Sequence, residues 1–163
     1  MHWAATFKQE KDLVEGCCPV HQTSPTWIKE KNYFFRLSAY GQRLLDHYSS
    51  HPEFLEPAVR RNEILRLLET GLDDISMSRT GQPWGIPMPS DPDSVVYVWM
   101  DALINYASGV GYGSDEQLFE KWWPADLHVI GKDITRFHCV VWPAMLMSAG
   151  VPLPRQVFGH GWV

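Results

Sequence analysis

Four residues near the C-terminal end of the chain have types and positions that suit the binding of the ribose of a nucleotide. Gly131 and Asp133 follow one short apolar run, and His160 and Gly161 follow another. If both runs are parallel strands, their carboxyl ends meet where such sheets bind ligands. Gly131 lets a ligand approach the backbone closely, and the Asp133 carboxylate can accept hydrogen bonds from ribose hydroxyls. Alternatively, Asp133 only caps a helix.

A second group is aromatic and suits a flexible apolar ligand. Ile134, His138 and Trp142 are four residues apart, which places them on one strip of a helix. Sulfur packs well against aromatic edges, and a thioether is a weak acceptor that one donor such as His138 can recognise, with Tyr106 close by. A core helix whose histidine bonds a backbone carbonyl explains the same spacing. The candidate pocket residues are Trp99, Ala102, Tyr106, Ile134, Phe137, His138 and Trp142.

The elements that must position these residues form a βαβ pattern. A run at 127–130, a helix from Asp133 to Ala149 and a second run at 156–158 follow one another, with Gly150 and Pro152 ending the helix. A right-handed crossover of this kind packs the helix onto a parallel sheet. The sequence therefore predicts an α/β fold.

A further strand is expected just upstream. The segment from Val95 to Trp99 is β-branched and aromatic, which is typical of a buried parallel strand. Asp101 can then cap a helix that begins at Ala102. Trp99 and Tyr106 would face one cavity from the strand end and the helix.

The N-terminal part reads as helices and loops. The apolar spacing predicts a helix within 29–50, capped by Asn32, and a second helix at 57–72. Residues 74–79 alternate as a strand does, and 115–123 suggest a short helix. Arginines of the second helix are explained by a solvated face or by contact with the phosphates of a nucleic acid.

A possible metal knuckle lies near the N-terminus. Cys17, Cys18 and His21 are close in sequence, whereas a structural zinc needs four ligands. The segment from His2 to Ala5 supplies no cysteine pair. We therefore expect a turn without metal and no zinc site.

Composition sets broad limits on the class of protein. The 163 residues are 45% hydrophobic and 20% charged, as in a globular domain. The net charge of −5 gives no global basic surface for nucleic acid. Three cysteines suggest a reducing, cytoplasmic location, and no apolar stretch predicts a membrane span.

Long phrases of the chain resemble the class I methionyl-tRNA synthetase family. They are the segments at 30–38, 96–106 and 126–163. The resemblance implies the second half of a Rossmann-type nucleotide-binding core with a parallel sheet at 90–163, preceded by the end of a connective insert at 1–89. The chain lacks the His-Ile-Gly-His signature and ends before the expected Lys-Met-Ser-Lys-Ser loop, so it resembles an internal piece.

The resemblance also implies roles for individual residues. The seven candidate pocket residues, from Trp99 to Trp142, match the family's methionine pocket. Arg79, in the phrase Ser-Met-Ser-Arg, matches an arginine that ties the insert to the cleft, although an exposed hairpin arginine would look the same. The positions that match ribose and adenine contacts are Gly131, Asp133, His160, Gly161 and Val163.

The implied activity is ATP-dependent attachment of methionine to tRNA, with Mg²⁺ in the complete enzyme. The implied partners are methionine, ATP, tRNA and a missing N-terminal half of the catalytic domain. We expect this chain alone to be inactive at a normal rate, and a binding-only fragment is the alternative. A redox Rossmann module is disfavoured, because no Gly-x-Gly-x-x-Gly follows a strand.

Overall fold

The computed structural model of the chain describes residues 10, 13–26 and 30–162. The chain divides into two compact units, residues 1–31 and 32–163, and each is described by itself. The boundary expected between residues 89 and 90 stays a prediction.

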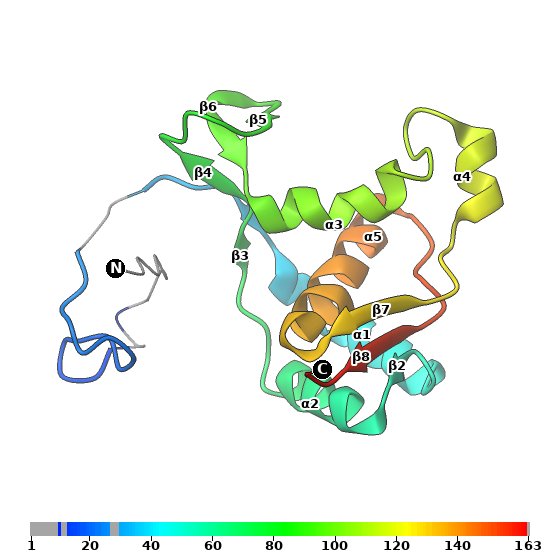
Figure 1. Ribbon diagram of the computed structural model, residues 1–163, viewed down its shortest axis with the longest axis horizontal. Coiled ribbons are helices and arrows are strands. Elements are labelled where there is room, and N and C mark those ends of the chain that lie inside the picture. The colour runs from blue at the N-terminus through cyan, green and yellow to red at the C-terminus, as the bar shows by residue number, and fades with distance from the viewer. Residues whose placement is uncertain (1–9, 11–12, 27–29, 163) are drawn as a thin grey trace. The chain divides into compact units, whose positions relative to one another are not determined.

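A parallel sheet forms the centre of the second unit. It consists of β2 (Leu55–Glu56), β8 (Val157–His160) and β7 (His128–Gly131), in the order β2-β8-β7. Figure 1 shows the red strand β8 between the other two. Gly131 is paired with His160, so the carboxyl ends of β7 and β8 are adjacent. The predicted βαβ unit and the α/β class are confirmed.

The crossover between β7 and β8 is not the single regular helix that the spacing predicted. It is divided into a 3₁₀ turn, η3 (Lys132–Ile134), a π-helical turn, η4 (Phe137–Val141), and a helix, α5 (Trp142–Ala149). In the π turn, the backbone N–H of Trp142 donates to the carbonyl of Phe137, five residues back. Such π turns are rare and are frequent at functional sites.

Pro143 explains why the regular hydrogen-bond ladder stops there. Proline has no N–H, so the carbonyl of Cys139, four residues earlier, loses its helical donor. The hydroxyl of Tyr48 donates to this carbonyl at 3.0 Å. The buried carbonyl is therefore satisfied by a side chain from another helix.

An antiparallel sheet precedes the crossover, where the sequence predicted a buried parallel strand. It consists of β4 (Ser78–Thr80), β6 (Asp91–Val96) and β5 (Pro87–Met88), in the order β4-β6-β5. Val95 to Trp99 was expected to be a buried parallel strand, which is wrong because β6 pairs antiparallel on both sides.

The helix after β6, α3 (Val98–Ser108), begins earlier than expected. Tyr97 is its N-cap residue, and its carbonyl accepts the N–H of Met100 at 2.8 Å. Asp101 is in the first turn rather than at the cap, where its charge favours the helix N-terminus. Trp99 thus lies on the helix and not at a strand end.

The expected cap of the first helix, Asn32, is wrong. The helix expected within 29–50 begins only after the 3₁₀ turn η2 (Leu37–Tyr40), so Asn32 does not cap it. Phe34 and Phe35 instead pair with another strand. These elements are β1 (Phe34–Phe35), α1 (Gly41–Ser50), α2 (Ala58–Glu69), β3 (Ile75–Ser76) and α4 (Glu116–Trp122).

The core of the second unit joins these helices to the parallel sheet. Leu44, Phe54 and Val140 are completely or almost completely buried, from α1, the segment before β2 and the π turn. Within the described residues, no helix is long and apolar enough to cross a membrane.

Candidate functional site

Aromatic side chains from α3 and the π turn form the centre of the candidate site. The ring of Trp99 stacks on Phe137, with centroids 4.1 Å apart and planes 14° apart. The Tyr106 ring lies edge-on to the His138 ring, with centroids 5.5 Å apart. Its centroid is 6.3 Å from that of the Trp142 ring. The structure therefore joins the two segments by two groups of ring contacts, Trp99 with Phe137 and Tyr106 with His138 and Trp142.

A chain of two hydrogen bonds orients His138. Its Nδ1 lies 3.1 Å from the carbonyl of Ile134, which can only accept, so Nδ1 carries the proton. The neutral ring then accepts at Nε2, which is 2.9 Å from the Tyr106 hydroxyl. Tyr106 is consequently the donor of this bond, and its oxygen keeps lone pairs for a ligand.

Burial favours the uncharged form of both groups. Desolvation lowers the pKa of His138 below its ordinary value of 6.5, although the Ile134 carbonyl opposes this shift. Desolvation also raises the pKa of the Tyr106 phenol. The cluster therefore offers a neutral, polarisable surface, which suits an apolar ligand. The donors of His138 and Tyr106 are both used within the pair, so a thioether would be recognised by packing against the rings.

The cluster is open on the α3 side. Tyr106 is 39% exposed, and Ala102, one turn earlier, is also exposed. His138 and Trp142 are buried beneath. A side chain that covered Tyr106 and Ala102 would bury apolar surface on binding.

Two residues of this cluster were missed by the sequence analysis. The ring of His128 is 4.5 Å from that of Tyr106, and His128 is 6% exposed. Trp123 lies 6.0 Å from Trp142 and 6.4 Å from His128. A histidine that begins an apolar strand was the available signal for His128, since a buried polar residue is more informative than a buried apolar one.

The second part of the candidate site is the edge formed by the carboxyl ends of β7 and β8. Gly131 and His160 are register partners, and Asp133 is exposed in the turn that follows. A Cβ atom on Gly131 would lie 2.8 Å from Oδ1 of Asp133, so a glycine is required for this carboxylate position. The N-cap residue of this turn is Gly131 and Asp133 lies within the first turn, so the interpretation of Asp133 as the helix cap is wrong.

Of the other residues predicted at this edge, the structure describes His160 and Gly161. His160 Nδ1 donates to the carbonyl of Gly161 at 2.6 Å. The ammonium of Lys132 lies over the Trp162 ring, 5.4 Å from its centroid. Val163 lies outside the described residues.

Arg79 is held within the antiparallel sheet. Its guanidinium lies 3.9 Å from the centroid of the Tyr97 ring and donates to the Ser76 hydroxyl at 2.7 Å. It also donates to the Ser78 carbonyl at 2.7 Å. Tyr97 caps α3, so Arg79 contacts the residue from which the aromatic helix begins.

The first unit contains the cysteine turn. Cys18 Sγ is 3.4 Å from His21 Nδ1. Hydrogen bonds from the backbone of His21 and Val20 lower the pKa of the Cys18 thiol to about 7. Within the described residues, no group of three or more His, Cys, Asp or Glu side chains could hold a metal ion. His2 to Ala5 lie outside them.

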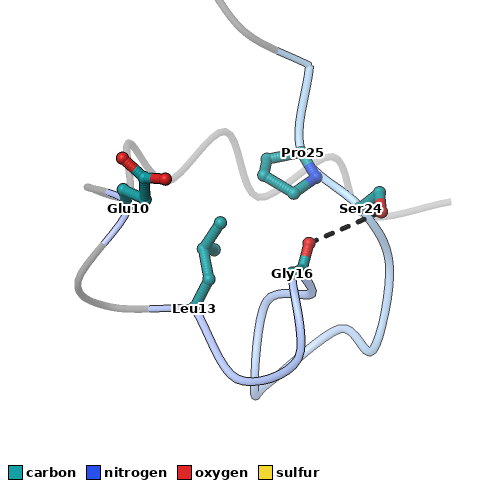
Figure 2. A pocket seen from close by; sticks show the side chains of 5 residues that line it. All are labelled: Glu10, Leu13, Gly16, Ser24 and Pro25. Carbon is teal, nitrogen blue, oxygen red and sulfur yellow. Dashed lines mark hydrogen bonds between the residues drawn. The ribbon is translucent and has the colours of Figure 1, made fainter.

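A cavity of about 390 Å³ also lies in the first unit (Figure 2). The Ser24 hydroxyl donates to the Gly16 carbonyl at 3.5 Å on its wall. None of the predicted site residues lines it. The lining residues are Glu10, Leu13, Gly16, Ser24 and Pro25.

Comparison with known proteins identifies the family of the chain. The family model described as tRNA synthetases class I (M) matches residues 4–163. The chain belongs to this family. Methionine–tRNA ligase of Thermotoga maritima is 55% identical over 162 residues, which are 97% of this chain and 26% of that protein.

Solved structures show the same relationship. Methionyl-tRNA synthetase of Mycobacterium tuberculosis in complex with methionyl-adenylate is 52% identical, with a TM-score of 0.86, over 96% of this chain and 32% of that one. The apo form of that enzyme gives a TM-score of 0.82 at 54% identity, over 89% of this chain and 29% of that one. The chain thus spans less than a third of the length of these relatives.

Proposed function

We propose that this chain is part of the catalytic domain of a methionine–tRNA ligase. It would carry the pocket for the methionine side chain and the strand ends that contact ribose and adenine. The observation that carries the proposal is the neutral, hydrogen-bonded Tyr106–His138 pair among aromatic rings, within a family whose solved M. tuberculosis member is in complex with methionyl-adenylate.

The pocket fits a thioether better than a charged or strongly polar side chain. Aromatic edges attract sulfur, and burying a charge beside the neutral His138 would be unfavourable. Selection against apolar amino acids of other lengths would rest on shape, at about 1–3 kcal/mol for each methylene. The seven pocket residues act together in this proposal, with Phe137 and Trp99 as one wall.

The strand ends supply the position of the nucleotide. Asp133 accepts from the ribose hydroxyls, and Gly131, His160, Gly161 and Val163 contact the adenosine. The methionine carboxylate attacks the α-phosphorus of ATP, and the bond to pyrophosphate breaks. Positioning and electrostatic stabilisation supply most of the rate of such a reaction.

Groups outside the described site complete this chemistry. Cations on the phosphates, including Mg²⁺, come with the complete enzyme, as does the contact with tRNA. Arg79 fixes the insert beside the cleft through Tyr97. We propose no role for zinc, and we propose the cytoplasm as the location.

The test is a chimera in which residues 4–163 replace the matching segment of the M. tuberculosis enzyme. We expect methionine-dependent exchange of pyrophosphate into ATP, with leucine as the negative control. His138→Ala should raise the methionine KM at least tenfold and leave the ATP KM within about twofold. A soluble, folded chimera without exchange would refute the proposal.

The open side of the cluster favours a second candidate for the chain by itself, namely methionine binding without activation. Trp99 and Trp142 both lie in the cluster, so binding should change tryptophan emission. A saturable change with methionine and none with leucine would support it. An unchanged emission from a folded chain would refute it.

A further inference from the structure

His128 has the surroundings of a residue that holds another side chain in place. It is the first residue of β7, and its backbone N–H donates to the Gln156 carbonyl at 2.9 Å. The backbone is therefore fixed in the parallel sheet. His128 is 6% exposed, and its ring faces the aromatic cluster rather than the exposed face that Val129 occupies.

Tyr106 needs such support. It projects from α3 with 39% of its surface exposed. Its ring contacts are with His128 at 4.5 Å, His138 at 5.5 Å and Trp142 at 6.3 Å. The His128 contact has the shortest centroid separation of the three.

The hydroxyl of Tyr106 must also reach one atom. Its bond to Nε2 of His138 requires the phenol to be within 2.9 Å of a ring that is itself fixed by the Ile134 carbonyl. A rotation of the phenol away from His138 would break this bond. The ring of His128 lies beside the phenol, 4.5 Å from the Tyr106 ring and 6.4 Å from the ring of His138 (centroid distances), and its contact with one side of the Tyr106 ring opposes that rotation.

We propose that His128 is a positioning residue for the methionine pocket, whose ring keeps the Tyr106 hydroxyl on His138. This inference rests on the proposed function and adds a residue to it. His128 acts through Tyr106 and does not itself contact the ligand. The proposed role depends on a planar ring, so we expect phenylalanine at position 128 to preserve it and alanine to abolish it.

The experiment uses the chimera with His128→Ala, His128→Phe and, as a matched control, His51→Ala. His51, the C-cap residue of α1, also stacks on a ring, since its centroid is 4.4 Å from that of His47, but it lies outside the aromatic cluster. We expect His128→Ala to raise the methionine KM about tenfold, as loss of a close aromatic contact and its packing can do, with kcat within about twofold. His128→Phe should stay within about threefold, and His51→Ala should have no effect.

A second readout does not depend on activity. With 3-fluorotyrosine incorporated, the ¹⁹F resonance of Tyr106, assigned through Tyr106→Phe, should shift or broaden in His128→Ala and remain sharp in His128→Phe. If both variants lose methionine affinity equally, or neither does, the proposal is wrong. An inactive chimera whose Tyr106 resonance still responds in this pattern would reject the proposed function and retain the positioning role.

Discussion

Acidification should lower the free energy of unfolding of this chain through protonation of the buried His128. Burial, and then the proximity of His138, lower the pKa of His128 from its ordinary value of 6.5 to about 4. In the folded state the ring stays neutral between these two values, whereas in the unfolded chain it binds a proton. Stability from this source is therefore complete above pH 6.5 and is lost as pH falls toward 4.

The size of the loss follows from the shift. At about 1.36 kcal/mol for each pKa unit, the whole change amounts to about 3 kcal/mol. Between pH 7 and pH 4.5, and with allowance for partial screening by solvent, we expect about 2 kcal/mol. This is a large share of the stability of an ordinary domain.

The assay is urea unfolding of the chain at pH 7 and at pH 4.5, for the unsubstituted protein and for His128→Phe. Carboxylates and other histidines titrate in both proteins, so only the difference between them reports on His128. We expect the unsubstituted chain to lose about 2 kcal/mol more than the variant over this interval. His51→Phe, at an exposed ring, is the control and should follow the unsubstituted chain within about 0.5 kcal/mol. Equal losses in the unsubstituted chain and His128→Phe would refute the reasoning, because His128 would then accept a proton in the folded state without cost.

Three further outcomes are expected. Tyr106→Phe removes the 2.9 Å bond that holds the Tyr106 ring against His138 and should raise the methionine KM of the chimera by about five- to tenfold, since such a bond contributes about 0.5–1.5 kcal/mol to the geometry that binds the ligand; an unchanged KM in pyrophosphate exchange would contradict this. Gly131→Ala places a Cβ 2.8 Å from Oδ1 of Asp133 and should raise the ATP KM about tenfold with little change for methionine, so a parallel rise in both constants would count against the ribose role. Phe54→Ala, at a side chain 1% exposed, should lower the free energy of unfolding by about 3–5 kcal/mol, whereas Val59→Ala, 53% exposed, should change it by less than about 0.5 kcal/mol in the same urea experiment.

The sequence was least reliable where one residue pattern fits two structures. The β-branched run at 95–99 satisfied the criteria for a buried strand, yet the structure ends β6 at Val96 and begins α3 at Val98. Periodicity over five residues cannot separate these cases. The π turn was missed for a related reason, since steps of four assume a regular helix and only Pro143 signalled otherwise.

The sequence by itself determined the βαβ unit and the adjacency of Gly131 and His160. Apolar runs, glycine turns and right-handed crossovers are local or nearly local properties, so they can be read along the chain. It also determined the family, because long phrases rather than single residues carry the resemblance. The expected roles of Asp133 and Arg79 remain predictions that the described contacts do not test.

Only the tertiary structure decided which neighbours the aromatic residues acquire. The place of His128 against Tyr106, and of Tyr48 on the carbonyl of Cys139, depends on how α1, α3 and β7 pack, and no spacing along the chain encodes it. Burial likewise sets the charge state of His128, because desolvation depends on every residue that covers the ring. The chemistry of the residues is thus present in the sequence, whereas their protonation and orientation arise from long-range packing.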